Sequence, residues 1–409
     1  MGTHLNKTLY LTRNGLLEPL GQSQVFAYLR GLSRDHVITL ITYEKHEDWA
    51  DSARMAQARK DCALHGIRWL PQLFRSHPKI IAPALSMVRM AWLVWGEVRR
   101  GRADLIHARS YIPAAVTLMV HRLTKVPFIF DMRALWPEEL ITAGRLKRGS
   151  ILHRAIVAVE RACLRDAAAV VSLTRAAAAH LKNEYPAELE SQQIAVIPTC
   201  ADLNRFTPAP AKLEGTIVHS CIGTILSGWF RTDWLAEWLS VVAMDDLDAQ
   251  FDIVTRDDSS RVRTALDPEE RLANRLNVAS CPPEEMQDVL RDHDLSVMFY
   301  AGGEVSELGR SPTRMAEILG CGLPVVANEG VGDVAEIVRR NRVGVIVDGP
   351  APAQMKAALD ELKILMQDPD LPKRCRTTAE SMFSLAIGTE AYREIYSTIL
   401  QTEDSTCAV

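Results

Sequence analysis

The sequence lacks several features that would each define a class of protein. Its eight cysteines include no Cys-x-x-Cys pair, which argues against a zinc site or a disulfide framework and favours a reducing compartment. The opening residues, MGTHLNKTLYLTRNG, contain no apolar core of signal-peptide length, so we expect a cytoplasmic location. No Gly-x-Gly-x-x-Gly follows any predicted strand, which disfavours a dinucleotide-dependent oxidoreductase.

The amino-acid composition is that of an ordinary globular protein. Apolar residues make up 47% and charged residues 24%, which argues against disorder, collagen-like repeats or a membrane channel. The chain has 409 residues, whereas single cores stop growing near about 250 to 300 residues. We therefore expect two domains.

Positive charge is concentrated in one region of the first half. Residues 51–150 carry 17 Lys and Arg against 7 Asp and Glu. Within them, a predicted helix at 79–102 combines Trp92 and Trp95 with arginines, and residues 144–154 add a second basic stretch. The pattern fits peripheral contact with an anionic membrane, although a solvated basic face and an ordinary buried helix also explain it. We expect no nucleic-acid partner.

Strand and helix patterns alternate along most of the chain. Such alternation predicts parallel sheets with right-handed crossovers, so the fold class is α/β with two Rossmann-like, doubly wound domains. We expect the ligand site in the cleft between them, at the carboxyl ends of the strands. The predicted divisions are an acceptor-binding domain at 1–205, a donor domain at 206–380, and a terminal helix with its tail at 381–409.

The segment GRSPTRMAEILGCGLPVVAN predicts an anion site in the second domain. Ser311 followed by Pro312 is typical of a helix start, with Ser as N-cap and Pro at the first position. The side chains of Ser311 and Thr313 and the backbone N–H groups of Thr313 and Arg314 would then hold a diphosphate at the positive end of the helix, and the Arg314 side chain adds a full charge. Glu317, one turn on, suits a ribose diol. The alternative is a plain cap followed by a solvated glutamate.

Two segments of the first domain supply acceptor-side candidates. Asp131 and Arg133 follow an apolar strand in FDMR, where side chains project toward a ligand. Asp131 is the candidate to accept or orient the acceptor proton, and Arg133 to hold a phosphate or sugar; a structural salt bridge is the competing account. Gly21, Gln22 and Ser23 open a helix after the first strand and are acceptor-binding candidates.

Five motifs, in order, resemble those of the family-4 glycosyltransferases, which have the two-domain GT-B fold. They are LEPLGQSQVFAYLRGLS (17–33), FDMRALWPEE (130–139), VIPTCADLNRF (196–206), IGTILSGWFRTDWL (222–235) and SPTRMAEILGCGLPVVAN (311–328). The resemblance implies retaining transfer of a sugar from a nucleotide diphosphate, in a branch with LGQSQ, FDMR and SPTR motifs. It also makes Gly223 a donor-binding candidate and implies a terminal helix that returns to the first domain.

The sequence departs from the family pattern at the donor sugar. The second Glu of the family's Glu-x7-Glu motif matches Glu317, but Gly309 occupies the first position. Glu304 and Glu307 lie nearby at the wrong spacing, so the carboxylate that contacts the sugar is unassigned.

Two further family positions are also replaced. The usual Arg and Lys phosphate clamp after the first strand of the second domain is missing, and Arg231 is its substitute candidate, with Arg256 and Arg310 in reserve. The family's His after the strand DLIHAR is replaced by Arg109, an acceptor-side candidate.

The expected function is sugar transfer from a nucleotide-diphosphate donor to a glycan or polyprenyl-diphosphate-linked acceptor in bacterial surface polysaccharide synthesis. The chemistry needs positioning and positive charge on the departing diphosphate. We expect no cofactor and no metal, because the Asp-x-Asp pairs do not fall in predicted cleft loops. The alternatives are a sugar-nucleotide epimerase of the same fold and a non-catalytic nucleotide-sugar-binding subunit.

Overall fold

The computed structural model describes residues 5–75, 81–190, 192–209, 215–272 and 274–407. The chain divides into two compact units: unit 1 holds residues 1–197 and 385–409, and unit 2 holds residues 198–384. The start of the predicted helix 79–102, at residues 79 and 80, lies outside the described residues, as do residues 1–4 and the last two of the predicted tail.

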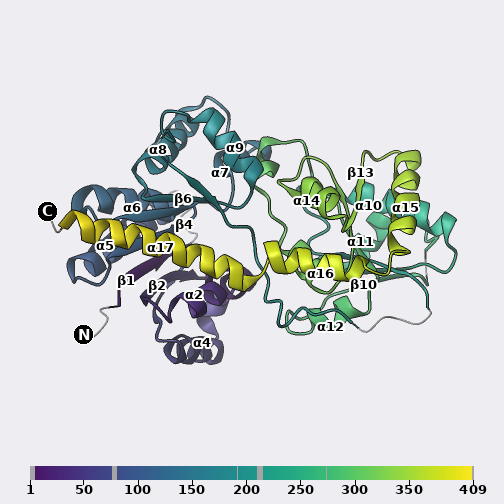
Figure 1. Ribbon diagram of the computed structural model, residues 1–409, viewed down its shortest axis with the longest axis horizontal. Coiled ribbons are helices and arrows are strands. Elements are labelled where there is room, and N and C mark those ends of the chain that lie inside the picture. The colour runs from purple at the N-terminus through teal and green to yellow at the C-terminus, as the bar shows by residue number, and fades with distance from the viewer. Residues whose placement is uncertain (1–4, 76–80, 191, 210–214, 273, 408–409) are drawn as a thin grey trace. The chain divides into compact units, whose positions relative to one another are not determined.

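Unit 1 contains a seven-stranded parallel sheet in the order β3-β2-β1-β4-β5-β6-β7 (Figure 1). The strands are β1 (Lys7–Leu11), β2 (Val37–Glu44), β3 (Arg68–Leu73), β4 (Leu105–Arg109), β5 (Phe128–Asp131), β6 (Ala169–Ser172) and β7 (Ile194–Val196). Strand order reverses between β1 and β4, and ligands of doubly wound sheets bind at such a switch point.

Helices flank this sheet. They are α1 (Pro19–Gly21), the π-helix η1 (Gln22–Phe26), α2 (Ala27–Leu32), α3 (His46–Ala50), α4 (Ser52–Leu64), α5 (Ile81–Arg99), α6 (Tyr111–Thr124), α7 (Trp136–Thr142), α8 (Ile151–Asp166), α9 (Arg175–Glu184) and α17 (Leu385–Cys407). Among the described residues, no helix is both long enough and apolar enough to cross a bilayer.

Unit 2 contains a six-stranded parallel sheet in the order β10-β9-β8-β11-β12-β13, so its switch point lies between β8 and β11. The strands are β8 (Val218–Ile222), β9 (Gln250–Val254), β10 (Leu276–Ala279), β11 (Leu295–Met298), β12 (Val325–Asn328) and β13 (Gly344–Val347). The helices are α10 (Thr232–Asp245), α11 (Ser259–Leu266), α12 (Met286–Arg291), the 3-10 helix η2 (Val305–Gly309), α13 (Thr313–Gly320), α14 (Val334–Asn341), α15 (Pro352–Met366) and α16 (Leu371–Met382).

Both faces of the unit 2 sheet are buried. Along β12, Val326 belongs to one hydrophobic core, while Val325 and Ala327 belong to the other. Successive side chains of a strand point to opposite faces, so the two cores lie on opposite sides of the sheet. This is why the strands appear in the sequence as continuous apolar runs. Two Rossmann-like domains are therefore confirmed.

The divisions between the units differ from the predicted ones at 205 and 380. Residues 198–205 belong to unit 2 because Leu203 and Phe206 pack into its core and the Thr199 hydroxyl donates a 2.7 Å hydrogen bond to the Ser311 carbonyl. The predicted single terminal helix is two helices. The break at Phe383 and Ser384 coincides with a 2.8 Å hydrogen bond from the Ala201 N–H to the Phe383 carbonyl, which ties the first piece to unit 2.

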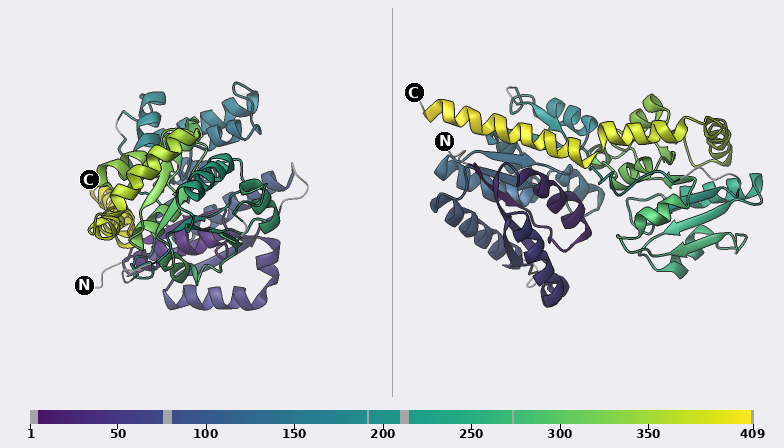
Figure 2. Two further views of the ribbon diagram at one scale, coloured as in Figure 1. Left: turned by 90° about the vertical axis from the view of Figure 1, so that its right-hand side faces the viewer. Right: turned by 60° about the horizontal axis from the view of Figure 1, so that its bottom comes forward.

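The second piece, α17, returns to unit 1 and packs against α2. The right view of Figure 2 shows it as one continuous helix. A Cβ at Gly31 of α2 would lie 2.5 Å from the Thr389 side chain, so the two helices approach closely. The last helix of the chain is thus part of the first unit.

Candidate functional site

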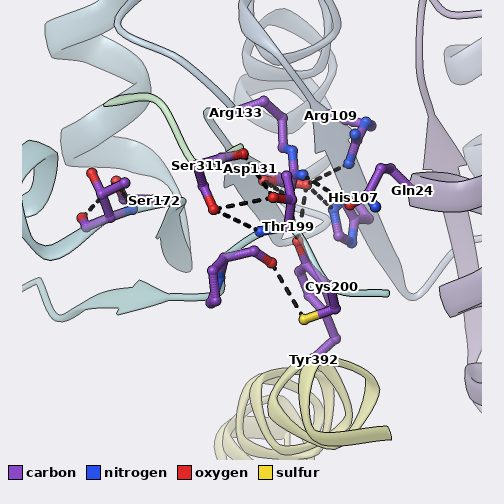
Figure 3. Close-up of polar contacts among 12 residues, drawn as sticks. Gln24, His107, Arg109, Asp131, Arg133, Ser172, Thr199, Cys200, Ser311 and Tyr392 are labelled. Carbon is purple, nitrogen blue, oxygen red and sulfur yellow. Dashed lines mark hydrogen bonds and ion pairs between the residues drawn. The ribbon is translucent and has the colours of Figure 1, made fainter. Parts of the chain in front are cut away.

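Polar side chains converge at the carboxyl ends of β4 and β5 in unit 1, beside the switch point. Figure 3 shows Asp131 surrounded by side chains from β4, η1, the loop after β5 and α17. We call this set the Asp131 cluster; its members are Gln24, His107, Arg109, Asp131, Arg133, Tyr392 and Tyr396. Three of them, Arg109, Asp131 and Arg133, were site candidates from the sequence.

Asp131 is the centre of the cluster and has no exposed surface. Its Oδ2 accepts a hydrogen bond from the Tyr392 hydroxyl at 3.1 Å and lies 3.3 Å from His107 Nε2 and 3.5 Å from Arg109. Arg133 lies 3.7 Å from Oδ1, which has no hydrogen-bond partner among the described residues. Burial raises the pKa of Asp131, but Arg133, His107 and Arg109 together outweigh burial and lower it to about 2.

The cluster carries an excess of positive charge. Two guanidinium groups, Arg109 and Arg133, face one carboxylate, and both side chains are at most 10% exposed. Burial lowers the pKa of His107, although Asp131 opposes the shift, so the imidazole is neutral near pH 7. A buried charge without a counter-charge is costly, which makes the cluster receptive to an anionic group.

Backbone geometry at the two strand ends is unusual. Ser110 follows Arg109 with φ 77°, and Arg133 itself has φ 63°. Non-glycine residues rarely adopt the left-handed region, and such residues gather at functional sites. The turn at Arg133 brings its guanidinium back toward Asp131, two residues earlier.

The helix after β1 contributes Gln24 rather than the predicted Gln22 and Ser23. Gln22 and Ser23 are exposed, and their side chains bond to the carbonyls of Leu16 and Pro19. Gln24 is buried and its Oε1 accepts from Arg133 at 3.5 Å. No pattern in the sequence indicates this contact, because Gln22–Phe26 form a π-helix, which rotates side chains away from their α-helical positions.

Gly21 has a packing role. A Cβ at this position would lie 2.0 Å from the Gly15 carbonyl oxygen, so only glycine allows the loop after β1 to lie on the helix. The same loop is fixed by the buried Glu44 at the end of β2, whose carboxylate accepts from the N–H groups of Leu16 and Leu17 at 2.8 and 3.2 Å.

In unit 2, the predicted helix start is one residue too early. Pro312 has an extended backbone and stands at the N-cap position, and α13 begins at Thr313. Ser311 is therefore not the cap. Its hydroxyl oxygen accepts from the Thr199 N–H at 3.1 Å, so it joins the first residues of unit 2 to the approach to α13.

Arg314 and Glu317 lie on consecutive turns of α13 and form an ion pair. Glu317 is buried, and burial raises its pKa above the usual value, although Arg314 opposes the shift. From the sequence, we expected these two residues to contact the ligand independently of each other. The structure shows that the arginine also neutralises the carboxylate beside the positive end of the helix.

The loop after β8 begins at Gly223, whose φ of 138° suits glycine. Asp257 accepts from the N–H groups of Ile225 and Leu226 at 2.6 and 2.9 Å and fixes the loop that follows. Arg231, the predicted substitute for the phosphate clamp, forms a bidentate pair with Asp233 and lies over the Trp234 ring. The positive charge of Arg231 is therefore already paired with the Asp233 carboxylate.

Arg310, a reserve candidate, lies between two aromatic rings and a carboxylate. It pairs with the buried Glu307 and lies 5.8 and 5.4 Å from the ring centroids of Trp229 and Tyr300. The other reserve, Arg256, is exposed just after β9. Within the described residues, no group of three or more His, Cys, Asp or Glu side chains is arranged to hold a metal ion.

The fold and the two polar sites define the class of protein. Two Rossmann-like parallel-sheet domains, each with polar side chains at its switch point, are the architecture of GT-B enzymes. Residues 22–200 match the family model of the glycosyl transferase 4-like domain, and residues 217–363 match the model of glycosyl transferases group 1. The chain belongs to the GT-B glycosyltransferases and is a glycosyltransferase enzyme.

This chain is similar to proteins with which it shares 14 to 26% sequence identity. A D-inositol 3-phosphate glycosyltransferase from Paenarthrobacter aurescens is 26% identical over 317 residues, which are 73% of this chain and 75% of that protein. The structure of a glycosyltransferase from Rickettsia africae aligns with a TM-score of 0.69 at 15% identity, over 97% of this chain and 99% of that one. HepE from Anabaena, in complex with UDP and glucose, aligns with a TM-score of 0.66 at 14% identity, over 96% and 99%.

Proposed function

We propose that the enzyme transfers a sugar, with retention, from a nucleotide diphosphate to an acceptor that carries an anionic group. A polyprenyl-diphosphate-linked glycan of bacterial surface polysaccharide synthesis has this chemistry, as does a glycan that carries an acidic group. The observation that carries the proposal is the buried excess of positive charge in the Asp131 cluster of unit 1. Unit 2 has an arginine of its own, Arg314, at the start of α13. HepE, which aligns with this chain, binds UDP and glucose.

On the donor side, α13 supplies the contacts in this proposal. The positive end of the helix at Thr313 and the guanidinium of Arg314 stabilise the diphosphate as it departs. Glu317 accepts from hydroxyl groups of the donor while Arg314 keeps it from repelling the phosphates. Charge on the diphosphate is balanced by arginine, so we propose that transfer needs no metal.

On the acceptor side, Arg109 and Arg133 hold the anionic group. Asp131 orients these arginines and is not the base that takes the acceptor proton. A general base needs contact with its substrate and a pKa near the working pH, whereas Asp131 is fully buried with a pKa of about 2. The competing account from the sequence, a structural Asp–Arg pair, is therefore the better supported one.

An apolar and basic face of unit 1 suits a lipid-linked acceptor. Leu85, Val88 and Trp92 follow one another on the outer side of α5 at helical spacing, and Trp92 is 72% exposed. Ile151 and Leu152 at the start of α8 are exposed as well and lie within the basic stretch 144–154. Both helices contact α6 (Figure 1). We propose that this face contacts the anionic surface of the membrane from the cytoplasmic side.

The test is a transfer assay with and without acceptor. The purified enzyme is incubated with a UDP-, GDP-, ADP- or CMP-sugar as donor and a polyprenyl-diphosphate-linked sugar as acceptor, in the presence of a chelator. The two measurements are release of the nucleotide and the anomeric configuration of the product. Nucleotide release that requires the acceptor and continues in the presence of the chelator supports the proposal. Conversion of the sugar nucleotide without acceptor identifies an epimerase, and binding without turnover identifies a non-catalytic subunit.

A further inference from the structure

The C-terminal helix contributes side chains to the Asp131 cluster. Tyr392 and Tyr396 lie one turn apart on α17, on the same side of the helix, and both are buried. The Tyr392 hydroxyl donates to Asp131 Oδ2 at 3.1 Å and accepts from Arg133 at 3.4 Å. The Tyr396 hydroxyl lies 2.8 Å from His107 Nδ1. Burial raises the pKa of both tyrosines well above the usual value, so both keep their protons.

These contacts fix the protonation pattern of the cluster. A neutral imidazole has one N–H, and His107 Nε2 faces the ionised Asp131 at 3.3 Å. Its proton therefore lies on Nε2, and Nδ1 accepts from the Tyr396 hydroxyl. Asp131 Oδ2 is then shared by Tyr392, His107 and Arg109, which leaves Oδ1 to Arg133.

Other contacts hold α17 in register on unit 1. Arg393 pairs with Asp35 at 2.7 Å and donates to the Gly31 carbonyl at 3.2 Å. The ring of Tyr392 meets that of Tyr28 edge to face, with centroids 5.3 Å apart, and the ring of Tyr396 meets His36 in the same way at 5.2 Å. The helix is thus held against unit 1 by contacts at the two tyrosines and at Arg393 between them.

We propose that Tyr392 and Tyr396 are positioning residues of the acceptor site. They hold Asp131 and His107 in place, and these two in turn direct the guanidinium groups of Arg109 and Arg133 toward an anionic acceptor. The last helix of the chain then supplies side chains that the site of the first unit needs, in addition to packing against that unit. This inference rests on the proposed function of the cluster.

The test removes single hydroxyl groups and compares them with a matched control. Tyr392→Phe and Tyr396→Phe each delete one hydroxyl of the cluster. Tyr185→Phe deletes a hydroxyl that donates to another buried carboxylate of unit 1, Glu160, at 2.7 Å and outside the cluster. The measurements are Tm, and kcat and KM for donor and acceptor separately.

We expect all three variants to lose Tm to a similar extent. In the two cluster variants, kcat/KM for the acceptor falls by at least about tenfold, because small misplacements of substrate-holding groups have large effects on rate. KM for the donor stays unchanged, and Tyr185→Phe keeps acceptor kcat/KM within about twofold. Equal effects of the three variants on acceptor kinetics would overturn the proposal.

A second measurement needs no turnover. In spectra of the enzyme labelled with ¹⁵N-histidine, we expect His107 as the Nε2–H tautomer in the wild type and a changed Nδ1 signal in Tyr396→Phe. An unchanged signal overturns the positioning role even in an active enzyme. A changed signal in an enzyme that transfers no sugar to any acceptor shows instead that the proposed function has failed while the contact itself is real.

Discussion

At the residue scale, two buried carboxylates of the same chemistry have opposite properties because of their neighbours. Burial raises the pKa of Asp131, but the two arginines and the histidine that face it outweigh burial and lower the pKa to about 2. Glu317 faces chiefly Arg314, and there burial prevails and raises the pKa. Asp131 therefore stays ionised and acts as a fixed counter-charge, whereas Glu317 is better suited to exchange hydrogen bonds with a bound sugar.

The substitution Asp131→Asn separates an orienting role from a chemical one. The substitution leaves two buried guanidinium groups without a counter-charge. We therefore expect it to lower the free energy of unfolding by about 3 to 5 kcal/mol and also to reduce transfer to the acceptor. The measurement is urea denaturation beside the transfer assay. Asp166→Asn is the control, because its partner Arg122 is half exposed and such pairs contribute about 1 kcal/mol or less. Full stability with lost turnover would instead make Asp131 the proton acceptor.

Two arginines of unit 2 are expected to differ in their effect on catalysis. Arg314→Ala removes a charge at the start of α13, so we expect kcat to fall by roughly 10² to 10³. Arg231 is held by Asp233 and Trp234, so Arg231→Ala has a smaller effect. Steady-state kinetics at saturating acceptor measure both. A larger loss for Arg231→Ala would return the phosphate-clamp role to that residue.

At the element scale, the alternation of strands and helices follows from sequence pattern, while the side chains that meet in the site do not. The apolar runs before FDMR and SPTR predicted β5 and the approach to α13. Gln24 was missed because a π-helix leaves no local signal, and Tyr392 because its partner lies 261 positions earlier. His107 stands inside an apolar strand, and a polar residue in such a strand was the signal available for it.

We expect the exposed side chains on the outer side of α5 to contact the membrane together. We expect the enzyme to sediment with vesicles that contain anionic lipid, less with zwitterionic vesicles, and less at high salt because charge attraction is screened. Trp92→Ser removes the most exposed ring of α5 and should weaken sedimentation. Trp49→Ser, on α3 and 39% exposed, is the control. Equal binding of both variants would contradict contact through α5.

At the whole-molecule scale, alternation in the sequence predicted two doubly wound domains, but their borders depend on distant partners. Ala201 bonds to Phe383 and thereby divides what the sequence presents as one terminal helix. Leu203 packs into the core of unit 2 although the prediction assigned it to the first domain. Such borders are set by tertiary contacts, which periodicity along the chain does not contain.

Buried histidines make the stability of the molecule sensitive to acid. Burial lowers the pKa of His219 to about 4, and the pKa values of His36 and His107 are lowered as well. The unfolded chain then binds more protons than the folded one, so stability present above the ordinary value near 6.5 is lost as the pH falls toward 4. We expect His219 alone to account for roughly 3 kcal/mol. Urea denaturation from pH 7 to pH 4 measures this, and an equally steep loss in His219→Gln would contradict it.

The most direct test of the account is thermal stabilisation of the protein by UDP, GDP, ADP and CMP. A nucleotide at about 100 times its dissociation constant should stabilise the wild type by about 2.7 kcal/mol. We expect one nucleoside diphosphate to give this shift and Glu317→Ala to lose it. Glu329→Ala, an exposed glutamate of unit 2 paired with Arg339, should keep it. No shift with any nucleotide, or an equal shift in Glu317→Ala, would contradict a donor site at α13.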